Sequence, residues 1–159
     1  MSLRNVGQLL VLVVLTAMTV QTDARGGAPG GKFQYGAPEQ TTGATGAIEL
    51  LTPTEGVYFN EYLRTVYITT KKRWLANMPA SVAKGQKGIN SVEFRILQDG
   101  TVPKEFMKIR TASGKADLDE ASLAGIRAAA PFSKLPADFT APYIELRFTF
   151  FYNLQPAPR

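Results

Sequence analysis

The sequence predicts an α+β domain, a two-layer sandwich in which two helices pack on one face of a three-stranded antiparallel sheet. Three patterns lead to this fold class. Apolar residues recur at helical spacing between residues 57 and 77, residues 90–97 alternate between apolar and polar, and residues 144–150 alternate again. A second helical pattern lies between the last two strands, so the expected order is helix, strand, strand, helix, strand.

The first helix is expected from Val57 to Asn77, after a start signal at residues 53–55 and before a stop at Pro79. Its buried stripe is expected to consist of Phe59, Leu63, Val66, Tyr67, Thr70 and Trp74. Core packing explains these aromatic side chains better than a ligand-binding pocket does. The basic run Lys71-Lys72-Arg73 lies in the last turns, where cations suit the helix dipole, and is expected to be a solvated face.

A β-hairpin is expected next. Its first strand places four residues on the better face: Asn90, Val92, Phe94 and Ile96. Asp99-Gly100 predicts a type I′ turn, which requires positive φ at both central positions. The returning strand is expected from Thr101 to Thr111, with Pro103 confining part of it to an edge or a bulge.

The second helix is expected from Leu118 to Ala130, begun by a capping box of Asp117 and Glu120 and ended by Pro131. An extended loop then leads to the last strand, in which apolar and polar residues alternate from Ile144 onward. If this register holds, one core should bury Trp74, Phe94, Ile96, Leu146, Phe148 and Phe150 together.

Residues 1–24 have the pattern of an export signal. Arg4 supplies a positive n-region, and the apolar stretch from Leu9 to Val20 is about 12 residues long, short of the ~20 that span a bilayer. Small residues at Thr22 and Ala24 predict cleavage after Ala24. Residues 1–24 are therefore expected to be a signal peptide or, if uncleaved, an N-terminal membrane anchor.

Residues 25–47 are rich in Gly, Ala, Pro and Thr without an apolar period, which predicts a flexible linker before a domain of residues 48–155. The linker contains the beginning of a phosphate-binding loop at Gly26, Gly31 and Lys32. Phe33 stands where Mg²⁺ coordination requires Ser or Thr, so no nucleotide site is expected there.

The composition argues against an enzyme. The 159 residues include no Cys and no His, which removes the thiolate nucleophile, the commonest general base and the commonest metal ligand. Ser113 and Lys115 could suggest a Ser–Lys dyad, but they are expected at a turn, where backbone geometry explains Ser-Gly. Asp117, Asp119 and Glu120 could suggest a carboxylate pair or a metal site, but capping and the helix dipole explain them at a helix N-terminus. The net charge of +5 comes from scattered residues, which argues against nucleic acid as a partner. We expect no cofactor, no metal and no small-molecule substrate.

The folded part contains a series of short motifs in a specific order: Trp74, Met78-Pro79, Gly88, Phe94, Asp99-Gly100, Ser113-Gly114, Leu118-Asp119, Ala121, Pro131-Phe132, Leu135-Pro136, and Leu146-Arg147-Phe148 through Asn153. Each is weak alone, but with this order and spacing residues 58–153 resemble the C-terminal domain of TonB-type energy transducers, in the TonB/TolA C-terminal family. The resemblance implies a sandwich fold without an active site. It also implies a periplasmic location, contact with outer-membrane or other envelope proteins, and a link to TonB-dependent transport.

The resemblance further implies that partner segments add as a strand beside the last strand of the sheet. That strand is expected to be an exposed edge, with partner-binding residues Tyr143, Glu145, Arg147, Thr149 and Phe151. The strand order of the sheet stays open at this point, and so does a homodimer.

The chain departs from full transducers of this family in two respects. It lacks the His of their anchors, and its linker of about 23 residues would reach only ~25–30 Å as a Gly-rich coil. The resemblance therefore supports the identity of the domain better than it supports a role in energy transduction. The alternative function is that of a structural accessory subunit of a larger membrane or envelope complex, anchored by its N-terminal segment.

Overall fold

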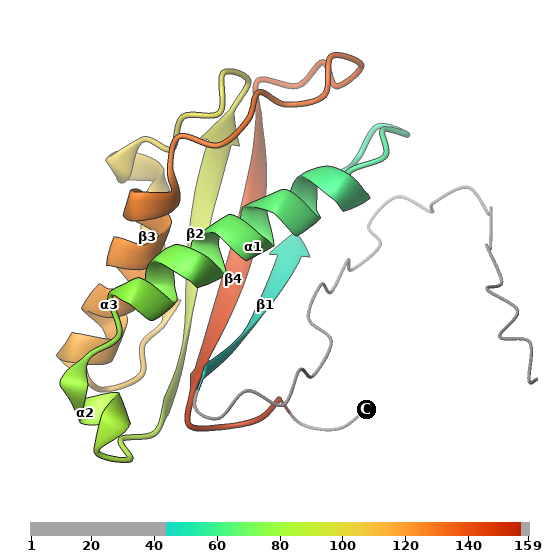
Figure 1. Ribbon diagram of the computed structural model, residues 1–159. Coiled ribbons are helices and arrows are strands. Elements are labelled where there is room, and N and C mark those ends of the chain that lie inside the picture. The colour runs from blue at the N-terminus through green and yellow to red at the C-terminus, as the bar shows by residue number, and fades with distance from the viewer. Residues whose placement is uncertain (1–43, 157–159) are drawn as a thin grey trace, which may run out of the picture.

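The computed structural model describes residues 44–156, so the predicted export signal and the predicted linker up to residue 43 lie outside the described part. Four antiparallel strands form one sheet in the order β1-β4-β2-β3. The strands are β1 (Ala44–Leu50), β2 (Gly88–Leu97), β3 (Met107–Thr111) and β4 (Tyr143–Tyr152). Two main helices, α1 (Asn60–Ala76) and α3 (Ala116–Ala129), cover one face of this sheet (Figure 1).

Two shorter elements complete the described chain. The four-residue helix α2 (Ala80–Ala83) follows α1, and the 3-10 turn η1 (Lys104–Phe106) precedes β3. Within residues 44–156, no helix has both the length and the apolar character that crossing a membrane requires.

The predicted two-layer α+β sandwich is confirmed, with one strand more than expected. β1 pairs antiparallel with β4 along its whole length, from Ala44↔Tyr152 to Leu50↔Leu146. Residues 44–47, predicted as the end of the linker, belong to this strand. They escaped prediction because Ala and Gly have little strand propensity, and because the four residues contain no large apolar side chain that would reveal an alternation.

Helix α1 buries the predicted stripe from Phe59 to Trp74, and all six stripe residues are buried. The predicted start at residues 53–55 is wrong, because the helix begins at Asn60. Glu55 and Gly56 have φ angles of 52° and 82°, a left-handed backbone that a right-handed helix cannot include.

The turn between β2 and β3 lies where Asp99-Gly100 predicts it, but it is not of type I′. Of this pair only Gly100 has positive φ, 88°, so the two positive angles of a type I′ turn are not present. The loop spans three residues and is closed by a hydrogen bond from Leu97 N–H to the carbonyl of Thr101, 2.9 Å. A Cβ atom at Gly100 would overlap the Phe132 carbonyl, so the loop after α3 rests directly on this turn.

The returning strand is shorter than predicted. Residues 104–106 form η1, and strand pairing with β2 begins only at Met107. A register shift between Ser91 and Val92 then interrupts the β2–β3 ladder. β3 is therefore a short, irregular edge.

The predicted capping box at α3 is wrong as well. The N-cap position is Lys115, without a side-chain cap, and Asp117 lies inside the first turn. Its carboxylate instead accepts hydrogen bonds from Ser81 and Gln86, while Glu120 pairs with Arg127 at 2.8 Å. Asp117 therefore ties α3 to α2 and the loop that follows it.

One hydrophobic core lies between the helices and the sheet. The six residues expected to be buried together, Trp74, Phe94, Ile96, Leu146, Phe148 and Phe150, are each fully buried in it. This confirms the predicted register of β2 and β4, with even-numbered residues of both strands turned toward α1 and α3.

Candidate protein-binding edge

The predicted partner-binding residues lie together on one face of β4. Tyr143, Glu145, Arg147, Thr149 and Phe151 are all half-buried, and they alternate with the fully buried residues of the core side. They therefore belong to the sheet face turned away from α1 and α3, which we call the open face.

β4 is not the edge strand that the sequence predicts. It lies between β2 and β1, and it pairs with β2 from Tyr143 to Tyr152 and with β1 from Leu146 to Tyr152. The prediction is wrong because it treated residues 44–47 as linker and so left β4 without a second neighbour. We call the side of β4 that β1 occupies the β4 edge.

The backbone of the β4 edge is bonded through its odd-numbered residues. Glu145 N–H donates to the Thr52 hydroxyl at 2.7 Å, and the Glu145 carbonyl accepts from Leu51 N–H at 2.8 Å. Backbone groups of successive strand residues point to opposite sides. Arg147 and Thr149 therefore direct their N–H groups toward β1, away from the rest of the sheet.

On the core side, β1 is held by two buried aliphatic residues and one glycine. Ile48 and Leu50 are 1% and 7% exposed. At Gly46, an added Cβ would lie only 2.6 Å from Cε1 of Phe148. The Phe148 ring cannot move aside easily, because it stacks on Tyr67 with centroids 5.6 Å apart and on Phe150 with centroids 4.5 Å apart. Only glycine fits at this position without a shift of the core.

The hydroxyl of Tyr67 fixes the same point of β1 from the helix side. It donates a hydrogen bond to the Gly46 carbonyl over 3.3 Å, and the contact is buried. Helix α1 thus contacts the backbone of β1 directly, in addition to the packing of side chains.

On the open face, a row of charged side chains crosses all four strands. Arg147 of β4 donates to Glu49 of β1 at 3.0 Å and to Glu93 of β2 at 2.8 Å. Two further cations, Lys108 and Arg110 of β3, approach Glu93 at 3.4 and 3.7 Å. The register places Glu49, Arg147 and Glu93 directly opposite one another.

The electrostatics of this row favour the charged forms of its central pair. Burial raises the pKa of Glu93. The hydrogen bonds and charges of Arg147 and Lys108 lower this pKa by more than burial raises it, so the net shift is downward. The hydrogen bond to Glu93 raises the pKa of Arg147, opposed by burial and supported by the charge of Glu49. Arg147 is thus the cation around which the row is built.

The residues weighed as enzyme candidates form structural contacts. The Ser113 hydroxyl donates to the Lys115 carbonyl at 3.0 Å, and the Lys115 ammonium donates to the Lys87 carbonyl at 2.9 Å, so the two side chains do not form a dyad. Asp119 accepts hydrogen bonds from Ser113 N–H and the Asn90 amide. Among residues 44–156, no three acidic, Cys or His side chains are grouped as a metal site would require.

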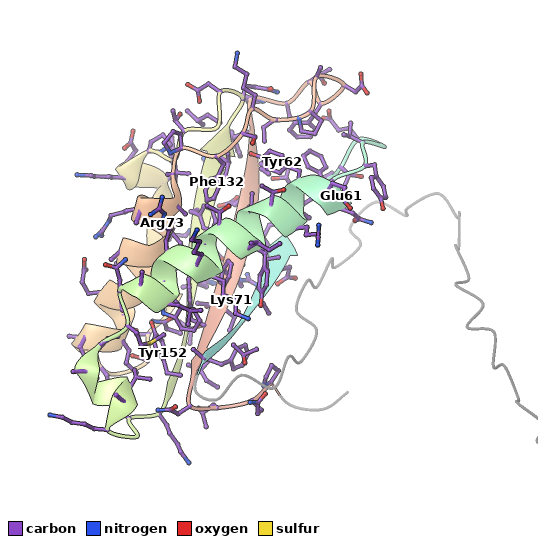
Figure 2. The ribbon with its side chains drawn as sticks, in the orientation of Figure 1. Glu61, Tyr62, Lys71, Arg73, Phe132 and Tyr152 are labelled. Carbon is purple, nitrogen blue, oxygen red and sulfur yellow. The ribbon has the colours of Figure 1, made fainter. Side chains whose placement is uncertain are left out.

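The basic run on α1 does not form a compact patch. Figure 2 shows Lys71 and Arg73 leaving the helix in different directions, as the 3.6-residue period requires. Lys71 Nζ lies 5.9 Å from the centroid of the Tyr67 ring, while Lys72 and Arg73 are exposed. The expectation of a solvated face is consistent with this arrangement.

The fold is that of a small α+β domain, with two main helices on one face of a four-stranded antiparallel sheet. The family model described as TonB C terminal matches residues 59–150, more than half of the chain. The chain therefore belongs to the TonB C-terminal family, a non-catalytic family. No curated protein and no solved structure matches the chain.

The extent of the match bears on the edge. It begins at Phe59, so β1 lies outside the family-matched part, while most of β4, the strand that β1 pairs with, lies inside it. A signal for β1 was present in the sequence. At the end of β1, the apolar residues Ile48 and Leu50 flank the polar Glu49, which is the same alternation that identified the other strands.

Proposed function

We propose that this protein is a periplasmic protein-binding module that binds an extended segment of an envelope or outer-membrane protein as a strand on the β4 edge. One observation carries the proposal. β1, a strand from outside the family-matched part, already lies on this edge as an antiparallel addition. The partner segment takes its place, and β1 covers the edge when no partner is bound.

The β4 edge has the two properties that strand addition requires. Its odd-numbered residues direct backbone donors and acceptors outward, which supplies affinity independent of sequence. The side chains of β1 meet a specific surface at every second residue, which supplies selectivity. β3, at the other end of the sheet, is shorter and carries exposed Lys108 and Arg110, features that discourage strand addition.

The proposed location rests on the family and on the N-terminal sequence. Loss of residues 1–24 from the native protein, measured as intact mass, would give a free periplasmic form. Retention of these residues would support the alternative, an accessory subunit anchored beside a larger membrane or envelope complex. Both forms leave the proposed edge unchanged.

The proposal can be tested by site-specific photo-crosslinking in cells that produce the full chain. A benzophenone side chain in place of Phe151 lies on the open face beside the β4 edge, next to Thr45 of β1. We expect two products, an intrachain link to β1 and a link to an extended segment of an envelope protein, both identified by mass spectrometry. The same group in place of Phe106 on η1, at the far end of the sheet, is the matched control.

A proline in place of Thr149 sharpens this test. It removes one backbone donor that points toward β1 and leaves the pairing of β4 with β2 in place. We expect the partner crosslink from position 151 to fall severalfold while the chain stays folded. An undiminished crosslink in the folded proline variant, or a partner crosslink from position 106 alone, would rule out the β4 edge.

A further inference from the structure

β1 fits the β4 edge through a definite pattern of side chains. The core side of the strand has a small residue at Ala44, no side chain at Gly46, and buried aliphatic residues at Ile48 and Leu50. The open side places a carboxylate at Glu49. The surface that meets these positions belongs to β4 and α1, so it remains when β1 leaves.

We propose that the segment bound at the β4 edge carries the same pattern as β1. Counting every second residue, this pattern is a small residue, a glycine and two aliphatic residues, with an acidic residue between the two aliphatic ones. This inference rests on the proposed function and adds to it the chemistry of the partner. β1 is then an internal copy of the partner segment, and the two compete for one surface.

The glycine position is set by Phe148 and Tyr67. A Cβ on the incoming strand would lie only 2.6 Å from Cε1 of the Phe148 ring, and that ring is stacked on both Tyr67 and Phe150. The Tyr67 hydroxyl is placed to bond the carbonyl of the residue at this point. A partner strand with a side chain here must either displace the ring or shift its register, and a shift by one residue turns its aliphatic side chains to the open face.

The acidic position is set by the charge that β1 leaves behind. Without Glu49, the row on the open face contains three cations, Arg147, Lys108 and Arg110, around the single carboxylate of Glu93. The neighbouring pair of Arg95 and Glu145 is balanced. Arg147 Nη1 then lacks its acceptor, so an acidic residue opposite Arg147 restores a charge-assisted hydrogen bond, whereas a basic residue is repelled.

The two aliphatic positions are set by the core. Ile48 lies opposite Phe148 and Leu50 opposite Leu146, and both β1 side chains are almost fully excluded from solvent. A polar residue at either position would be buried without a partner. On the open face, Thr45 lies opposite Phe151 and is buried, at 4% exposed, whereas Ala47 lies opposite Thr149, is half-buried and sets no comparable demand.

The pattern can be tested with peptides and with the full chain. Gly46→Val in the full chain puts a branched side chain against Phe148 and should release β1 from the edge. The probe is a fluorescent peptide of residues 44–51, acetylated and amidated, followed by fluorescence anisotropy. Its matched variants are Gly46→Val, Glu49→Lys and Ala47→Ser. Ile48→Ala in the chain is a second, milder opening variant, for use if Gly46→Val does not fold.

We expect the peptide to bind the opened chain at least about tenfold more tightly than the unaltered chain, because β1 no longer competes. The Gly46→Val and Glu49→Lys peptides should each bind at least about tenfold more weakly than the parent, and the Ala47→Ser peptide within about threefold of it. Binding of the parent peptide should protect the amides of β4 from hydrogen exchange, and it should weaken with added salt.

The two hypotheses fail in different ways. Equal binding of all four peptides would overturn the side-chain pattern but leave strand addition in place. Binding of none of them to either opened chain would overturn strand addition at the β4 edge itself. If the Glu49→Lys peptide binds as tightly as the parent while the Gly46→Val peptide still binds weakly, Arg147 does not select the partner.

Discussion

Tyr152, the last residue of β4, shows how much one buried hydroxyl connects. It accepts a hydrogen bond from Trp74 Nε1 at 2.9 Å, donates to the Leu118 carbonyl at 2.7 Å, and lies 2.6 Å from the Ser122 hydroxyl. Burial raises the pKa of Tyr152 to about 12, opposed by its hydrogen bonds with Ser122 and Trp74. Both main helices are therefore fixed to the C-terminal end of β4, where Figure 2 places Tyr152 beneath α1.

Tyr152→Phe should destabilise the domain by about 1–3 kcal/mol, because it leaves the indole N–H of Trp74 buried without its acceptor. Urea denaturation followed by Trp74 fluorescence measures this loss. Tyr143→Phe, on the open face of the same strand, should cost less than about 0.5 kcal/mol. Equal losses for the two variants would mean that the buried network contributes nothing.

Glu93 makes the stability depend on pH in a predictable direction. Its pKa in the folded protein lies below the ordinary value of 4.5, because Arg147 and Lys108 outweigh the effect of burial. A carboxyl group of this kind stabilises the fold above its unfolded-state pKa, and that contribution is lost as the pH falls through the folded-state pKa.

Glu93→Gln should therefore be less stable than the unaltered chain at pH 7, and the difference should shrink as the pH is lowered below the unfolded-state value. Melting temperatures across this range give the comparison. Glu105→Gln, an exposed change on η1, should leave the pH profile unaltered. A difference between Glu93→Gln and the parent that stays constant with pH would contradict the assigned ion pairs.

At the scale of the elements, β1 differs from the two central strands, β2 and β4, in how it is held. It lies at an edge, it is joined to α1 by a loop with two positive-φ residues, and its tightest contact is at a glycine. β2 and β4, by contrast, pair over ten residues each at the centre of the sheet. Unlike either central strand, β1 can therefore leave the sheet while the pairing of β2 with β4 stays intact.

Gly46→Val should release β1 without unfolding the sandwich. Hydrogen exchange should become at least about tenfold faster for the amides of residues 44–50, while those of α1 and α3 keep their protection. Ala47→Val places the same side chain on the open face of the same strand and should leave exchange unchanged. Equal exchange in both variants would show that Phe148 moves aside at little cost.

At the scale of the whole molecule, the helices and the sheet share a single core, and Phe148 lies near its centre. Its ring contacts Tyr67 of α1 and Phe150 of β4, and it lies opposite Ile48 of β1 and Val92 of β2. Folding of such a small domain is stabilised by only about 5–15 kcal/mol in total. A single large cavity at this place therefore threatens the entire fold.

Phe148→Ala should cost about 3–5 kcal/mol and lower the melting temperature steeply, to the point of unfolding a marginal domain. Calorimetry or urea denaturation measures the loss. Phe151→Ala removes the same ring from the open face of β4 and should cost less than half as much. An unchanged melting temperature in Phe148→Ala would contradict the assigned register of β4.

The sequence alone determined the class of the fold and its core. The stripe from Phe59 to Trp74 and the alternation in β2 and β4 identified the buried residues, because helix and strand periods follow from the geometry of the chain itself. The sequence also predicted the position of the turn at Gly100 and contained the motifs that place the chain in its family.

Only the tertiary structure decided which strands are neighbours and what covers β4. Glu49 and Arg147 are 98 positions apart, and no local pattern reports that they meet. The small residues at 44–47 resemble a linker until Phe148 and Tyr67 are placed over Gly46, where a larger side chain would not fit. Asp117 likewise resembles a cap until Ser81, 36 positions away, is placed beside it. Periodicity is a local property of the chain, whereas the identity of an edge depends on contacts between distant residues, and the edge is where we place the function.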